Sequence, residues 1–138
     1  MPIDHFHALQ EDEQVYSLEP EHLRQSVDHL YSAMDILRDC LKTLGSGALS
    51  GGFSQRLSDS WLEINKCRIH TENIPFIEEL LIPAMGYVND AKCMFDSLVA
   101  MKLGMTKHGL INIVQCIREA MAGIFMSIEE LESWMQPI

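Results

Sequence analysis

The polar and apolar positions of this chain follow a helical period rather than the alternation of a strand. From Glu19 to Leu44 the apolar positions alternate in steps of four and three, which places them on one face of a helix. They are Leu23, Val27, Leu30, Met34, Leu37, Leu41 and Leu44. Pro20 suits the first turn of a helix, because its missing N–H would have no partner there. Gly45 and Gly47 predict where the helix ends.

Three further segments repeat this pattern. A second helix is predicted from about Gly52 to Thr71, with an apolar stripe formed by Phe53, Leu57, Trp61 and Ile64. A third is predicted from about Pro75 to Leu103, kinked or split by Pro83, with core positions Phe76, Leu80, Leu81, Met85, Val88, Phe95, Leu98 and Met101. After a Thr106 cap, a fourth is predicted from about Lys107 to Met135, with a seam of Leu110, Val114, Ile117, Met121, Ile124, Ile128, Leu131 and Met135.

These segments predict an all-α fold. Because the connections are short and no strand pattern persists, we expect an antiparallel bundle of four main helices with a kinked third helix. Residues 1–18 show no sustained period and are expected to form an N-terminal arm, followed by a single helical-bundle domain over residues 19–138. The apolar face of the last helix is wide, because further apolar residues lie off its seam: Ile111, Ile113, Phe125 and Trp134. That width favours a homodimer over a monomer.

The charge balance narrows the possible partners. The chain carries 20 acidic and 10 basic side chains, a net charge of −10. Such a surface disfavours direct binding to nucleic acid or to an anionic membrane, and it suits a basic protein partner. Solubility alone is the other explanation of the acidic surface. The chain has no run of eighteen apolar residues and no signal-peptide pattern at its N-terminus, so we expect a cytoplasmic protein that does not span a membrane.

The cysteines and histidines do not form a recognisable metal or cofactor site. Cys40, Cys67, Cys93 and Cys116 lie more than twenty residues apart, which fits neither a zinc framework nor a compact disulfide scaffold. We expect reduced thiols. His5 and His7 are close enough to share a metal ion, but no helical Glu-x-x-His pair or cysteine cluster completes a site. The sequence contains no phosphate-binding loop, dinucleotide fingerprint or nucleophile elbow. No metal and no cofactor are therefore predicted.

One short motif carries possible chemistry. Arg24, His29 and Tyr31 form the pattern R-x4-H-x-Y. Over these eight residues the chain resembles HEPN-type ribonucleases, which include helical toxins of toxin–antitoxin pairs. The resemblance implies a site that cuts RNA, in which Arg and His meet across a dimer. The histidine would act as a general acid or base, and the arginine would stabilise developing negative charge. A surface Arg and His beside a helix seam is the structural alternative.

The methionine content of the chain suggests a binding function rather than catalysis. The chain has nine methionines, and this adaptable side chain is frequent on binding surfaces as well as in cores. Met94, Met105 and Met126 fall off the main seams and, with Trp134, are candidate partner-binding residues. We therefore predict a non-enzymatic protein-interaction module of the adaptor, chaperone or inhibitor/immunity type, which binds a partner through an acidic, partly Met-rich helical surface. The alternative is a HEPN-like ribonuclease of a toxin–antitoxin or defence system.

Overall fold

The described part of the chain is almost entirely helical. The computed structural model describes residues 19–46, 52–101 and 106–135. Within these ranges the helices are α2 (Pro20–Ser46), α3 (Gly52–Thr71), α4 (Pro75–Ala100) and α5 (Lys107–Met135), and no residue belongs to a strand. The all-α prediction is confirmed, and the predicted helix bounds agree to within three residues. The predicted arm over residues 1–18 lies outside the described residues.

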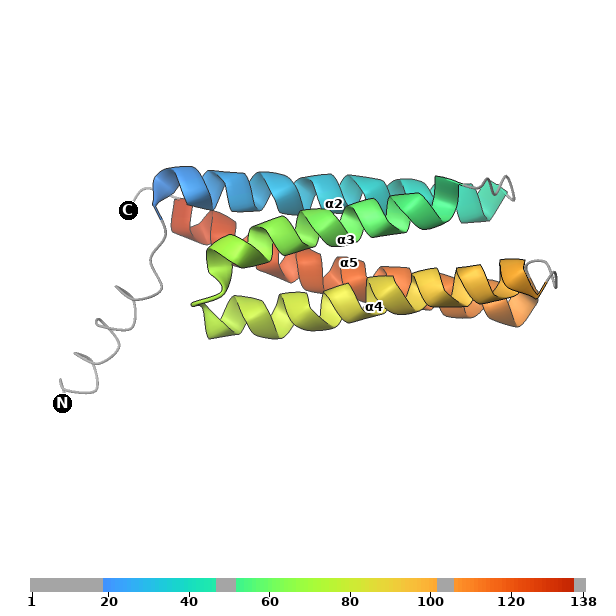
Figure 1. Cartoon of the computed structure of the whole chain (residues 1–138). Coiled ribbons are helices and arrows are strands. Elements are labelled where there is room, and N and C mark those ends of the chain that lie inside the picture. The colour runs from blue at the N-terminus through green and yellow to red at the C-terminus, as the bar shows by residue number, and fades with distance from the viewer. Residues whose placement is uncertain (1–18, 47–51, 102–105, 136–138) are drawn as a thin grey trace.

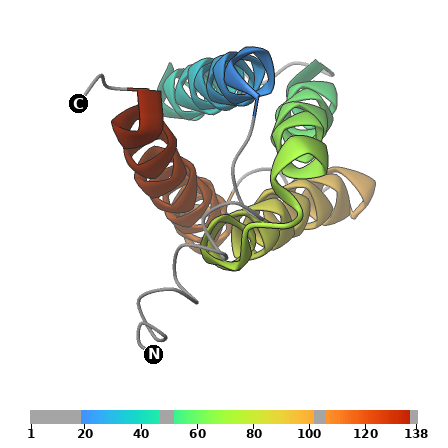
Figure 2. The same ribbon diagram turned by 90° about the vertical axis from the view of Figure 1, so that its left-hand side faces the viewer.

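The four helices lie lengthwise beside one another. Figure 1 shows that the chain reverses its direction between consecutive helices, and the end-on view in Figure 2 shows the helices around a common interior. Helix α2 packs against α3 and α5, and α4 packs against the same two helices. Each helix therefore has two neighbours, and its apolar face is buried between them.

The core is formed by one apolar stripe from each helix. On α3 this stripe includes Phe53, Leu57 and Ile64, which are fully buried. The rings of Phe53 and Phe95 pack 4.7 Å apart between α3 and α4. Because burying apolar surface is the main force that favours folding, these stripes fix which side of each helix faces inward.

Several positions differ from the predicted stripes. Ile113 was expected to lie off the seam of α5, but it is fully buried, whereas Leu110 and Val114 pack only at the edge of the core. An ideal helix turns every 3.6 residues, so a strict seven-residue seam drifts sideways by about 20° per repeat. On α3 the same rotation places Ser60 in the core and leaves Trp61 half-buried.

Three predicted core residues are exposed instead. Phe76, Met101 and Met135 keep 49%, 64% and 44% of their surface accessible. Phe76 and Met135 lie at the ends of α4 and α5, and Met101 is the residue just after α4. Fewer neighbouring side chains surround a helix end than its middle, so a residue there can match the period and still face solvent.

Pro83 does not divide α4, which continues from Pro75 to Ala100. Proline lacks an N–H and leaves the carbonyl of the residue four positions earlier, Glu79, without its helical partner. Both residues are exposed, so water can reach the affected turn. The expectation of two separate helical pieces is therefore not met, and a bend at Pro83 stays a prediction.

Helix α5 illustrates how local signals position the helices. The Thr106 hydroxyl accepts a hydrogen bond of 3.0 Å from the Gly109 N–H, which confirms the predicted cap. Further along, a Cβ on Gly123 would lie 2.9 Å from the carbonyl oxygen of Leu80, so glycine permits α4 and α5 to approach closely. By length and composition α5 could also cross a membrane; here its apolar stripe packs against α2 and α4.

Candidate functional site

The three residues of the R-x4-H-x-Y motif point to different neighbours. His29 faces α3, where its Nδ1 lies 2.9 Å from Oε1 of Glu63. Tyr31 faces α5 and donates a 2.7 Å hydrogen bond to Oε2 of Glu132. Arg24 is exposed and lies 3.8 Å from Glu21 on its own helix. Five residues correspond to about 140° around a helix, so a single protomer does not bring Arg24 and His29 together.

The contacts of His29 and Tyr31 shift the pKa of Glu63 and of Tyr31 itself. Burial tends to raise the pKa of Glu63, but hydrogen bonds with His29 and Lys66 outweigh burial and lower that pKa below its ordinary value. Conversely, the hydrogen bond to Glu132 raises the pKa of Tyr31. The contacts with His29 and Lys66 therefore stabilise the ionised form of Glu63. The His29–Glu63 and Tyr31–Glu132 contacts also tie α2 to α3 on one side and to α5 on the other, which is a structural role.

Further histidines lie on the same side of α2. The rings of His22 and His70 stack with their centroids 4.7 Å apart, which joins the start of α2 to the end of α3. Burial, followed by the nearby charges of His22 and His29, lowers the pKa of His70. Among the described residues no group of three His, Cys, Asp or Glu side chains could hold a metal ion. His5 and His7 lie outside these residues.

The predicted partner-binding residues do not share one environment. Met94 is half-buried and packs against the core, whereas Met126 and Trp134 on α5 are 50% and 39% exposed. The Trp134 indole N–H donates a 3.0 Å hydrogen bond to Glu130. Met105 lies outside the described residues. Met126 and Trp134 therefore remain available to a partner.

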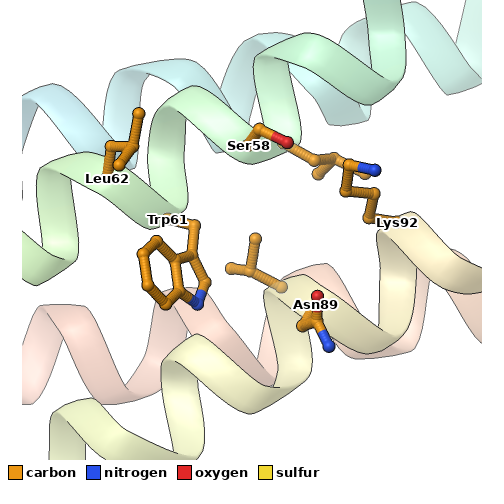
Figure 3. Close-up of a pocket in the computed structure, with 7 residues that line it drawn as sticks. Ser58, Trp61, Leu62, Asn89 and Lys92 are labelled. Carbon is orange, nitrogen blue, oxygen red and sulfur yellow. The ribbon is translucent and has the colours of Figure 1, made fainter.

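A more distinctive feature is the groove between α3 and α4, where Trp61 was predicted from the sequence to belong to the apolar stripe of α3. Trp61 separates two hollows in this groove, with volumes of about 300 and 400 Å³. Figure 3 shows the first hollow, where the Trp61 indole reaches from α3 toward α4 and the Lys92 side chain extends toward Ser58. Both hollows touch Trp61 and Asn89. We call the two hollows together the Trp61 groove.

The floor of the Trp61 groove is apolar. Leu57 and Val88 line the first hollow, and Met85 lines the second. All three belong to the buried core. Two more apolar residues, Leu62 and Ile82, also line the groove, and about half of each is exposed. An apolar side chain entering either hollow would therefore leave water for a largely hydrophobic surface, which is favourable.

The cations that line the groove are already paired. The Lys92 ammonium donates a 3.0 Å hydrogen bond to Asp96 and lowers the pKa of that carboxyl. Arg68 Nε and Glu78 Oε2 lie 3.1 Å apart, and both atoms are buried. Their geometry is that of an ion pair without a hydrogen bond. Neither cation is therefore left without an acidic neighbour, and the groove is close to neutral.

Besides the paired cations, each of the two helices presents a row of uncharged residues along this side. Residues spaced by four, three and four positions share one face of a helix, and this spacing selects Ser58, Leu62, Asn65 and Ile69 on α3 and Ile82, Gly86, Asn89 and Cys93 on α4. All eight are exposed or half-buried. On a chain with a net charge of −10, this uncharged double row is a distinct surface. In the sequence, this surface could have been recognised from the four–three spacing of uncharged residues near Trp61.

Known proteins do not add to this assignment. Comparison of the chain with protein-family models, with curated proteins and with solved structures finds no match. No relative therefore supplies a function, and the Trp61 groove is the candidate site that the chain's own residues provide.

Proposed function

We propose that this chain is a non-enzymatic protein-interaction module of the adaptor, chaperone or inhibitor/immunity type. The observation that carries the proposal is the Trp61 groove, whose floor is apolar and whose charges are paired, on an otherwise acidic chain. Protein interfaces have this character at their centre, where charged residues are depleted and aromatic residues enriched. Met126 and Trp134 on α5 form a second exposed apolar surface for the same kind of partner.

The proposal also covers the helix arrangement, oligomeric state, partner and cellular location of this module. We envisage an antiparallel bundle, bent at Pro83, that forms a homodimer and binds a basic protein in the cytoplasm, without direct contact with nucleic acid or membrane. The net charge of −10 supports a basic partner. The exposed residues Ile111 and Phe125 support self-association through α5, since 52% and 51% of their surfaces are accessible.

A ribonuclease is the second candidate function. The observation in its favour is the contact between His29 and Glu63, since a carboxylate that holds an imidazole can orient it for proton transfer. Because Arg24 points elsewhere in the protomer, this function requires a second copy to supply the arginine. Loss of RNA cleavage in an Arg24→Ala/His29→Ala variant would support it, and cleavage that persists in that variant would eliminate it.

Affinity capture of the full chain from the cells that make it tests the interaction function. The eluate is analysed by mass spectrometry, and its molar mass is measured by light scattering. We expect one heterologous protein in stoichiometric amount, in a complex heavier than one or two copies of the 15.7 kDa chain. Recovery of the chain alone, together with RNA cleavage that depends on His29, would replace this proposal with the ribonuclease.

A further inference from the structure

Gly86 lies in the middle of α4 without a packing reason inside the chain. Glycine destabilises a helix interior relative to alanine. At Gly123 and Gly109 close neighbours explain the missing side chain, because an added Cβ would lie 2.9 Å from the Leu80 carbonyl oxygen and 2.8 Å from Leu98 Cδ1, respectively. At Gly86 no atom of the described residues beyond the adjacent turns of α4 lies within 4 Å of that position. The exposed Gly86 instead lines the larger hollow of the Trp61 groove.

The two hollows are spaced like successive turns of a helix. On α4 the first hollow is lined by Val88, Asn89 and Lys92, and the second by Ile82, Met85, Gly86 and Asn89. The two sets are displaced by about four residues along α4, which corresponds to roughly one turn, or 5.4 Å. Side chains three or four positions apart on a docked helix have the same spacing.

We propose that the Trp61 groove receives one amphipathic helix of a partner protein. Two bulky apolar side chains, three or four positions apart on that helix, enter the hollows on either side of Trp61, and its backbone crosses α4 at Gly86. This inference rests on the proposed interaction function and names its surface and the chemistry of its partner. Because the charges that line the groove are paired and the whole chain has a net charge of −10, the partner helix has an uncharged apolar stripe flanked by Lys or Arg.

The four described helices of a second copy do not offer a matching pair of side chains. Among the residues that the structure describes, no two of the large exposed apolar side chains lie three or four positions apart on one helix. The closest pair that shares one face of a helix is Leu62 with Ile69 on α3, which are seven positions and therefore about two turns apart. Their spacing exceeds that of the hollows. The surface of the chain thus favours a heterologous helix over self-association at this groove.

A synthetic helix tests the spacing directly. The probe is a dye-labelled Ala/Lys/Gln helix of about 16 residues with two leucines four positions apart. The control probes carry alanines in place of both leucines, or leucines seven positions apart. Fluorescence anisotropy with the full-length chain should show at least about tenfold tighter binding of the first probe than of either control, because only the first buries two leucines.

Two glycine variants identify the surface that is used. Gly86→Gln adds a side chain at the larger hollow, whereas Gly45→Gln adds the same side chain at another helical glycine with nothing within 4 Å of its Cβ position. Both exchanges favour a helix, so circular dichroism should show two folded proteins. We expect Gly86→Gln to weaken binding of the first probe at least about tenfold, and Gly45→Gln to leave it within about twofold.

Three results would overturn the groove assignment. The first is that the leucine and alanine probes bind the chain equally well. The second is that the Gly86→Gln variant binds the leucine probe as tightly as the wild type does. The third is that light scattering shows a wild-type dimer, which the Gly86→Gln substitution converts to a monomer. The proposed function is judged separately by affinity capture. If the Gly86→Gln variant captures a heterologous partner as well as the wild type does, the groove is not the binding surface, but the interaction function still holds. A wild-type chain that captures no partner would refute the interaction function itself.

Discussion

Gly86 and Gly123 should respond in opposite ways to the same substitution by alanine. Each gains about 1 kcal/mol of helix propensity when glycine becomes alanine. At Gly86 this gain is unopposed, since among the described residues no atom beyond the adjacent turns of α4 lies within 4 Å of the new methyl group. Gly86→Ala should therefore raise the free energy of unfolding by ~0.5–1 kcal/mol.

At Gly123 the methyl group meets the backbone of α4. The nearest atoms are the Leu80 carbonyl oxygen at 2.9 Å and the Ala84 Cβ at 3.5 Å. A carbonyl cannot rotate away as a side chain can, so α4 and α5 must separate. Overpacking of this kind costs about 1–3 kcal/mol, which cancels or exceeds the gain in helix propensity. Gly123→Ala should therefore lower the free energy of unfolding by ~0–2 kcal/mol.

Urea denaturation of the two variants and the wild type provides the measurement. The variants should differ from each other by about 1–3 kcal/mol, or roughly 4–10 °C in Tm, with Gly86→Ala the more stable. Equal stabilisation by both substitutions would show that α4 and α5 are not in close contact at Gly123. Destabilisation by Gly86→Ala would show that an internal contact fills the space assigned to the groove.

Three further predictions concern titration and thiol access. Because the pKa of Glu63 is lowered from 4.5, its stabilising effect is present above that pH and is lost on acidification; by urea denaturation, Glu63→Gln should therefore be destabilising at about pH 7 and progressively less so as the pH falls below 4.5. Because burial and then the charge of His22 lower the pKa of His70 below 6.5, an NMR titration should place it below that value, and closer to it in His22→Gln; no change in that variant would contradict the stacked pair. Burial raises the pKa of Cys40 to about 11 and of Cys67 to about 12, so a disulfide reagent should modify exposed Cys93 first and these two only after unfolding.

The helices could be predicted from the sequence because their signals are local. Pro20, Thr106 and the four–three spacing of apolar residues depend only on neighbouring positions, and they located the helices to within three residues. The rotation of each helix was less predictable. On α5 a strict heptad reading selected Leu110 and Val114, whereas the 3.6-residue turn brought Ile113 into the core.

The candidate site depended on contacts between helices, which spacing along one helix cannot give. Trp61 fits the apolar stripe of α3, and only the packing of α4 leaves it half-buried between two hollows. The residues of the R-x4-H-x-Y motif are close in sequence but do not form a shared site within the protomer. His29 turns toward Glu63, and Tyr31 turns toward Glu132. Met126 and Trp134 are exposed as a binding role requires, and that role stays a prediction.

The most direct test of the central claim is photo-crosslinking of the chain in the cells that make it. A photoreactive amino acid is placed at Leu62, on the groove, and in separate proteins at Met126 and at Arg38, an exposed polar position on α2. An interaction module that uses the Trp61 groove should give one heterologous adduct from position 62 and none from position 38. Absence of any heterologous protein adduct at positions 62 and 126 would contradict the claim that this chain functions by binding another protein.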